Sequence, residues 1–178
     1  MKKLIALVVV CLLLVGLCAC ETGPSLVGTA PADSKPSTEA TSAPEDKAFK
    51  VGDVVELNDI LVTFIGVTES TGSEYNKPEE GNVYVLCEFE ITNNSDNELA
   101  VSSIMSFTAY CDDYSCDYSL SALLEKGNKD QLDGSVAAGK KMKGVVGYEV
   151  PADWKELEIH YITDLLSSNK IVFVATNN

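Results

Sequence analysis

Residues 81–97, GNVYVLCEFEITNNSDN, are the stretch that decides the fold. From Val85 to Ile91 every second residue is apolar or a thiol. A period of two is typical of a β-strand that turns one face to a core and the other to water. We therefore expect a strand here, with its glutamates in water, followed by a polar turn at 93–97. The outward set by this count is Tyr84, Leu86, Glu88 and Glu90.

Further strands are expected along the rest of the chain. Runs rich in β-branched and aromatic residues are separated by turn-forming pairs such as Asn58-Asp59. These strands span residues 54–57, 60–67, 103–111, 141–150, 157–162 and 170–175. Only 119–126 and 163–168 look briefly helical, and neither is long enough to be a crossover helix. Many short strands between turns indicate an all-β, antiparallel β-sandwich.

Two groups of motifs carry a family resemblance. The first is GNVYV (81–85) with the turn ITNNSD (91–96), and the second is LDGSVAAGKK (132–141), followed by Gly144 and YEVP (148–151). In this order they resemble an immunoglobulin-like domain of unknown function in lipoproteins of Gram-positive bacteria. The resemblance covers about residues 51–163. It implies a two-sheet immunoglobulin-like sandwich at the cell envelope, and it brings no known catalytic residues. A telomeric-repeat-binding-factor-2-like label that this domain sometimes carries has no support in these residues.

The N-terminal segment indicates export. Two lysines precede an apolar run at 4–17, which is shorter than the roughly 20 residues needed to cross a bilayer. Residues 1–19 are therefore expected to be a signal peptide. The sequence LCAC (17–20) resembles a bacterial lipobox, whose cysteine receives a diacylglyceryl thioether and becomes the first mature residue. We expect lipid attachment at Cys20, with simple secretion or a retained anchor as the alternatives; two acyl chains suffice for stable anchoring.

Residues 20–47 are expected to form a disordered tether between the lipid and the domain. Pro, Ser, Thr and Ala dominate the segment, which leaves little apolar surface to bury. As a flexible coil it would span roughly 30 Å. The remaining residues, 48–178, contain every aromatic side chain and form the expected domain.

The charge balance excludes one class of partner. The 178 residues include 27 Asp and Glu against 13 Lys and no Arg, for a net charge of -14. A polyanion is bound by clustered Lys and Arg that displace its counterions, so nucleic acid is not an expected partner. The basic cluster Lys140, Lys141 and Lys143 is too small for nucleic acid, although it could contact anionic lipid or teichoic polymer.

Three cysteines lie in the expected domain. Cys111 and Cys116 bracket four residues. If the two ends of this hairpin face each other, their Cβ atoms could approach the distance of about 3.8 Å found in disulfides. Extracellular location permits oxidation, so either a Cys111–Cys116 bridge or two free thiols is expected. Cys87 is expected in the core as a small apolar residue, rather than as a nucleophile paired with His160.

The other polar clusters favour no chemistry. His160 is the only histidine, and strand alternation places it in water beside Glu158. Asp112, Asp113 and Asp117 gather on one loop without the spacing of an EF-hand, so we expect a solvated acidic tip in preference to a calcium site. The sequence contains no phosphate loop and no nucleophile-elbow motif. We therefore expect no catalytic residues, no metal and no cofactor.

These expectations combine into one functional hypothesis. The chain is expected to be a lipid-anchored lipoprotein on the extracytoplasmic face of a bacterial cell membrane, with a non-catalytic immunoglobulin-like binding domain. An envelope protein or polymer is the expected partner, contacted through loops at one end of the sandwich. One alternative is a small-ligand or metal-binding accessory protein of the envelope. The other is a thiol-redox protein that uses Cys111 and Cys116.

Overall fold

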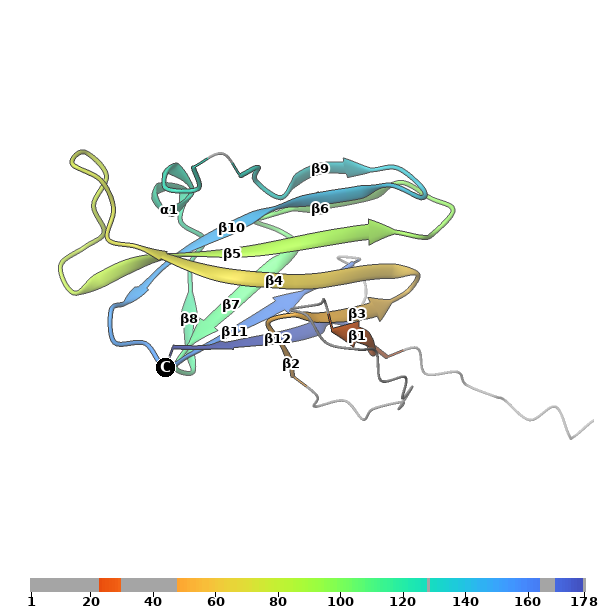
Figure 1. Cartoon of the computed structure of the whole chain (residues 1–178), viewed down its shortest axis with the longest axis horizontal. Coiled ribbons are helices and arrows are strands. Elements are labelled where there is room, and N and C mark those ends of the chain that lie inside the picture. The colour runs from red at the N-terminus through yellow and green to blue at the C-terminus, as the bar shows by residue number, and fades with distance from the viewer. Residues whose placement is uncertain (1–22, 30–47, 128, 164–168, 178) are drawn as a thin grey trace, which may run out of the picture.

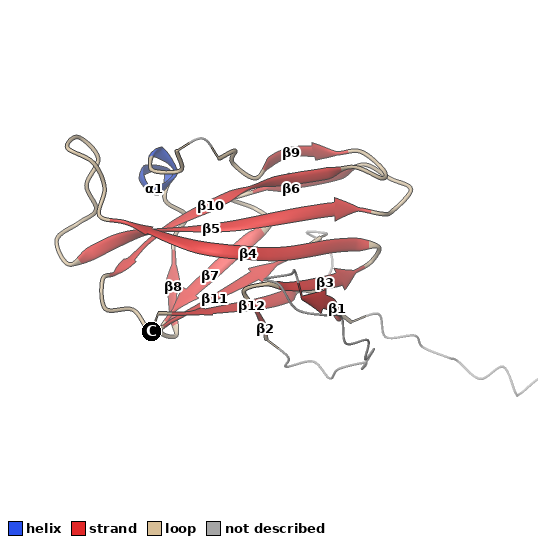
Figure 2. Ribbon diagram, viewed as in Figure 1, coloured by secondary structure: helices blue, strands red, loops and turns tan. Residues whose placement is uncertain are grey.

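The structure is a computed structural model, which describes residues 23–29, 48–127, 129–163 and 169–177. These residues form β-sheets around one core, with a single short helix among them, and the predicted all-β, immunoglobulin-like sandwich is confirmed (Figures 1 and 2). The predicted signal peptide and Cys20 lie outside the described residues, as does 164–168 of the second predicted helix. In the described ranges, no helix is long and apolar enough to span a membrane.

The first sheet has five strands in the order β1-β3-β4-β5-β10, and all neighbouring strands are antiparallel. Its strands are β1 (Ser25–Thr29), β3 (Asp53–Leu57), β4 (Ile60–Ser70), β5 (Asn82–Asn93) and β10 (Lys141–Pro151). β3 and β4 are joined by Asn58 and Asp59, both with positive φ. Positive φ at both central residues is the requirement of a type I′ turn, which matches the twist of a hairpin.

The second sheet has five strands in the order β2-β12-β11-β7-β8. Its strands are β2 (Phe49–Lys50), β12 (Ile171–Thr176), β11 (Glu156–Tyr161), β7 (Phe107–Cys111) and β8 (Tyr114–Cys116). The pairing of β2 with β12 is parallel, and the others are antiparallel. A separate antiparallel ribbon is formed by β6 (Leu99–Ser102) and β9 (Asp133–Val136).

The predicted strand 103–111 is too long at its start, because β7 begins at Phe107. Residues 102–106 form a turn instead. The backbone N–H of Ser106 donates to the carbonyl of Ser102 at 2.8 Å, and the Ser106 hydroxyl accepts from the Ser102 N–H at 3.1 Å. Ser102 and Ser106 therefore close a turn, which the alternation of polar and apolar residues in the sequence does not reveal.

Aromatic rings fill the space between the two sheets. Phe64 of β4 stacks on Phe89 of β5, with ring centroids 4.6 Å apart. Phe173 of β12 approaches both rings from the opposite sheet, with centroids at 5.6 Å. Each such fully buried side chain contributes about 2 kcal/mol through the hydrophobic effect. Cys87 is also buried in this core, as predicted.

A second, smaller cluster lies on the outer face of the first sheet. Tyr84 and Leu86 are only 1% and 3% exposed there, because α1 (Leu120–Leu124) covers them with Ala122 and Leu123. The prediction of a strand with one face in water is therefore wrong at this end of β5, although Glu88 and Glu90 do lie on the outer face. The close approach of α1 depends on β10, where a Cβ on Gly147 would lie 2.9 Å from the Cβ of Ala122.

β1 corrects the prediction of a fully disordered tether. Ser25–Thr29 forms an edge strand on β3, with Ser25 opposite Glu56 and Thr29 opposite Asp53. Leu26 packs against the main core, whereas Val27 is exposed. The predicted disorder does not hold for these five residues, because one half-buried apolar side chain and a free sheet edge suffice to dock them.

The sandwich has two ends, which are named here for later use. The β1 end carries the turn at Asn58-Asp59, the turn 94–98 between β5 and β6, and the turn 137–140 between β9 and β10; it lies at the right of Figure 1. The hairpin end carries the β7–β8 turn at Asp112-Asp113, the loop 152–155 and the end of β12; the C-terminus marks it in Figure 1. β5, the longest strand of the sandwich, has twelve residues and is about 40 Å long.

Candidate functional site: an acid-lined pocket at the hairpin end

A surface pocket of about 180 Å³ opens at the hairpin end. It lies on the outer face of the second sheet, where β7 and β11 run side by side with Tyr110 opposite Glu158 and Thr108 opposite His160. Its lining residues come from β7, from the β7–β8 turn and from β11. They are Tyr110, Asp112, Asp113, Glu156, Glu158 and His160.

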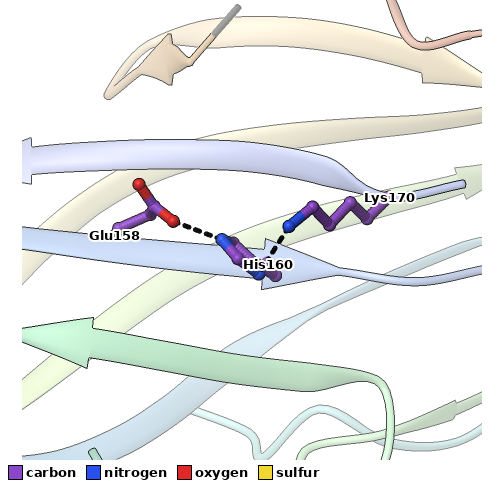
Figure 3. Close-up of polar contacts among 3 residues, drawn as sticks. All are labelled: Glu158, His160 and Lys170. Atoms are coloured by element: carbon purple, nitrogen blue, oxygen red, sulfur yellow. Dashed lines mark hydrogen bonds and ion pairs between the residues drawn. The ribbon is translucent and has the colours of Figure 1, made fainter. Parts of the chain in front are cut away.

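His160 links one acid of the pocket, Glu158, to Lys170 (Figure 3). Its Nδ1 lies 3.2 Å from the Nζ of Lys170, and its Nε2 contacts the Oε1 of Glu158. A lysine ammonium can only donate, so Nδ1 accepts and Nε2–H donates to the carboxylate. His160 lies on the outer face beside Glu158, but the prediction that it faces water is wrong. Its side chain is only 12% exposed, because the Tyr110 ring, 5.2 Å away, packs beside it.

Asp112 has a structural role at the rim of the pocket. Its carboxylate accepts the backbone N–H groups of Lys155, at 3.1 Å, and Glu156, at 2.9 Å. It thereby ties the β7–β8 turn to the start of β11. Within the described residues, no set of three His, Cys, Asp or Glu side chains is placed to hold a metal ion. The predicted acidic tip is therefore not wholly solvated, because the Asp112 carboxylate is hydrogen-bonded to the backbone.

The remaining acids of the pocket give it its chemical character. No hydrogen bond from a described residue reaches the carboxylates of Asp113 or Glu156, and Glu158 contacts only His160. These carboxylates, on a rigid sheet beside the Tyr110 ring, form a surface complementary to an ammonium or guanidinium group. The strand alternation of 156–160 could have identified this face from the sequence, but the contribution of Tyr110 from another strand could not be foreseen.

The predicted Cys111–Cys116 pair is brought together, but not in the predicted register. The β7–β8 turn has two residues, Asp112 and Asp113, both with positive φ. Cys111 therefore faces Tyr114, and Cys116 faces Ala109. The two thiols are diagonal neighbours on the inner face and are free. Diagonal positions are farther apart than the directly opposed pair that the prediction assumed, although the two side chains still hydrogen-bond to each other.

The acidity of these thiols is low. Burial, followed by the negative charge of Asp112, raises the pKa of Cys111. Burial and the neighbouring Cys111 raise the pKa of Cys116 to about 12. Burial also raises the pKa of Cys87, which faces the core while His160 lies on an outer face. A reactive thiol requires a lowered pKa, so these surroundings favour inert thiols.

Two of the three lysines in the basic cluster, Lys141 and Lys143, are paired with glutamates, whereas Lys140 is exposed. Lys141 contacts Glu90 at 2.9 Å, and Lys143 contacts Glu88 at 3.1 Å. Glu88 also contacts Lys129 at 2.6 Å. Burial raises the pKa of Glu88. Its hydrogen bonds to Lys129 and Lys143, together with their positive charges, lower the pKa by more, so the net pKa lies below the usual value. This pairing leaves little positive charge for a polyanion.

At the β1 end, Asn93 is the centre of a hydrogen-bond network. Its side chain is fully buried. Its Nδ2 donates to the carbonyls of Asn97, at 2.7 Å, and Val136, at 2.8 Å. Its Oδ1 accepts from the backbone N–H of Ser95, at 3.0 Å, and from the Ser95 hydroxyl, at 2.7 Å. The sequence identifies 93–97 only as a polar turn, whereas the structure shows that Asn93 joins β5 to the β6–β9 ribbon.

Comparison with known families now defines the class. A family model described as a domain of unknown function, DUF4352, matches residues 49–171. The chain belongs to this family of β-sandwich domains, and the family resemblance predicted from the sequence motifs is confirmed. Among curated proteins, none matches the chain.

Several solved structures are similar to this chain at low sequence identity. One is a candidate lipoprotein, ycdA, from Bacillus subtilis, with a TM-score of 0.56, 19% identity and 67% of this chain covered. The chain spans 37% of that protein. Another is the yjhA protein of Bacillus subtilis, with a TM-score of 0.54, 18% identity, and 70% of this chain and 97% of that chain covered. A third, an uncharacterized β-sandwich protein from Clostridium difficile 630, has a TM-score of 0.47 and 18% identity over 76% of this chain and 99% of that chain.

Proposed function

We propose that the chain is a lipid-anchored protein of the extracytoplasmic membrane face, whose sandwich binds a partner through the acid-lined pocket. The lipobox resemblance at 17–20 supports the anchor. The description of the structural neighbour ycdA as a candidate lipoprotein agrees with it. The role of the domain is non-catalytic, and an envelope protein or polymer is the partner.

One observation carries the binding role: carboxylates without a described hydrogen-bond partner line a pocket on a rigid sheet. A carboxylate at the rim of the pocket is complementary to a cationic group of the partner. Such a pair of charges steers the partner toward the pocket and fixes its orientation there. The partner of this pocket therefore presents an amine or a guanidinium, as a basic protein segment or a polymer with amino groups would.

Photocrosslinking tests the binding role. A photoreactive residue in place of Tyr110, in the lipidated chain within its own envelope, should give a discrete adduct. The matched control is Tyr75, which is 92% exposed against 38% for Tyr110. Random collisions favour the more exposed position, so an adduct at Tyr110 that is absent at Tyr75 supports the pocket. Adducts that follow exposure alone would contradict it.

The anchor has a separate test. Metabolic labelling with a fatty acid should modify the wild-type chain, and Cys20→Ala should abolish the label. Cys11→Ala, a change in the predicted signal peptide, should leave it. Labelling that persists in Cys20→Ala would contradict the assignment of the lipid to this residue.

Two alternative functions are distinguished by simple measurements. For the small-ligand or metal-binding alternative, calcium or zinc at about 100 times its Kd should stabilise the fold by about 2.7 kcal/mol, which thermal melts would detect. The thiol-redox alternative requires Cys111 and Cys116 to react readily, and counting alkylated thiols before and after reductant would reveal such a pair. The raised pKa values of both thiols argue against that alternative.

A further inference from the structure

The position of β1 determines where the chain leaves the sandwich toward its N-terminus. β1 is antiparallel to β3, and its first residue, Ser25, pairs with Glu56 near the Asn58-Asp59 turn. The chain before Ser25 therefore emerges at the β1 end. The asymmetric burial of Leu26 and Val27 shows that the strand is docked by its side chains as well as by its backbone.

The short distance from Ser25 to Cys20 limits how far this end can lie from a lipid on Cys20. Five residues of fully extended chain reach at most about 18 Å. If β1 were undocked, the 29 residues from Cys20 to Phe49 would act as a flexible coil of roughly 30 Å, with a much longer maximum reach. Residues 30–47 join two strands of the domain, β1 and β2, so their length adds nothing to the reach while β1 is docked.

We propose that β1 holds the sandwich with its β1 end against the lipid headgroups and its hairpin end directed away from the membrane. This proposal rests on the proposed lipid anchor at Cys20. The acid-lined pocket, at the hairpin end, then lies farther from the bilayer than the β1 end. In that orientation the pocket is open to partners in the envelope.

The composition of the β1 end opposes insertion among the acyl chains. Its turns carry the acids Asp59, Asp96 and Glu98 against the single lysine Lys140, and no large apolar side chain of these turns is exposed. The network of Asn93 fixes the turn 94–98 to β9. A polar, ordered surface of this kind can rest on headgroups, while the acyl chains on Cys20 provide the membrane affinity.

Energy transfer from two labelled positions to a lipid acceptor tests the orientation. The lipidated full chain would be reconstituted in vesicles of phosphatidylethanolamine and phosphatidylglycerol that contain an acceptor-labelled lipid. Donor fluorophores on non-natural residues would replace Asn94 at the β1 end or Asp153 at the hairpin end, both exposed. We expect clearly more efficient transfer from Asn94 than from Asp153.

A pair of variants with the same added charge isolates the role of β1. Leu26→Asp should undock β1 and reduce the difference in transfer between the two donors, since the full tether then separates the domain from the lipid. Val27→Asp, on the exposed side of the same strand, should keep the difference. Equal transfer from both donors in the wild type, or an unchanged difference in Leu26→Asp, would overturn the proposal.

The anchor and the orientation can fail separately. Mass spectrometry of the purified chain shows whether Cys20 carries its lipid. An unmodified Cys20 would overturn the anchor and the orientation together. A modified Cys20 with equal transfer from the two donors would overturn the orientation alone.

Discussion

At the β1 end, Asn93 places all the hydrogen-bonding capacity of its side chain in contacts within the fold. At the hairpin end, Glu156 and Asp113 line a pocket without a partner among the described residues. Both ends are polar, and both are built from turns of the same sandwich. A polar turn is therefore not evidence of a binding site by itself; the hairpin end differs because its unpartnered carboxylates line a pocket.

The β1 end is most sharply tested by Asn93→Ala. This change removes the side-chain partner of two carbonyls and of the two donor groups of Ser95, and the bond to the Val136 carbonyl is buried. Buried groups left unsatisfied cost about 1–3 kcal/mol each, and partial relaxation makes a total loss of about 3 kcal/mol the expected result. Denaturant unfolding measures it.

The matched control for this variant is Asn94→Ala in the same turn. The Asn94 side chain is exposed, so its removal should change the free energy of unfolding by less than about 0.5 kcal/mol. Equal losses from the two variants would show that the network of Asn93 does not hold this end together.

The outer face of the first sheet has its own packing constraint, which Gly147→Ala should reveal. The added Cβ would lie 2.9 Å from the Cβ of Ala122 and 3.1 Å from the carbonyl oxygen of Ser119, so α1 must move away from β10. Overpacking of this kind costs about 1–3 kcal/mol, measured by denaturant unfolding. Gly66→Ala is the control, because a Cβ there meets nothing within 4 Å; a similar loss in both would contradict tight packing of α1.

The smallest expected effect on stability is that of Glu88, which lies between the two ends. The pKa of this carboxyl in the folded state is lowered below its ordinary value of 4.5. Its contribution to stability is therefore present above that value and is lost as the pH falls through the lower folded pKa. Glu88→Gln should destabilise the fold at pH 7 and have no electrostatic effect in acid, when unfolding is followed against pH.

Exposed Glu98 provides the control for this pH dependence. Glu98→Gln should change stability little at any pH, because solvent-exposed charges interact weakly. A loss of stability in Glu88→Gln that persists unchanged in acid would show that packing, not charge, accounts for the role of Glu88.

The main features of the fold were predictable because apolar and polar residues alternate along the strands that face the core. The Asn58-Asp59 pair and the period of β5 are local signals, and the structure confirms both. The burial of Tyr84 was not predictable in this way, since alternation does not reveal that α1 covers the second face. β1 was missed because the docking of Leu26 depends on a sheet edge far along the chain.

The candidate site was less predictable, since it depends on strand register. A four-residue loop would have placed Cys111 opposite Cys116, but the positive φ of Asp112 and Asp113 closes a two-residue turn. Likewise, Glu158 and His160 were correctly placed side by side from one strand. Tyr110 joins them only through the pairing of β7 with β11.

The central claim is that one end maintains the fold and the other binds, and one paired measurement tests it most directly. In the lipidated chain with the photoreactive residue at position 110, Glu156→Gln combined with Glu158→Gln should abolish the adduct. The free energy of unfolding should meanwhile stay within about 1 kcal/mol of the wild type. An adduct that persists at full yield in this stable double variant would contradict the account.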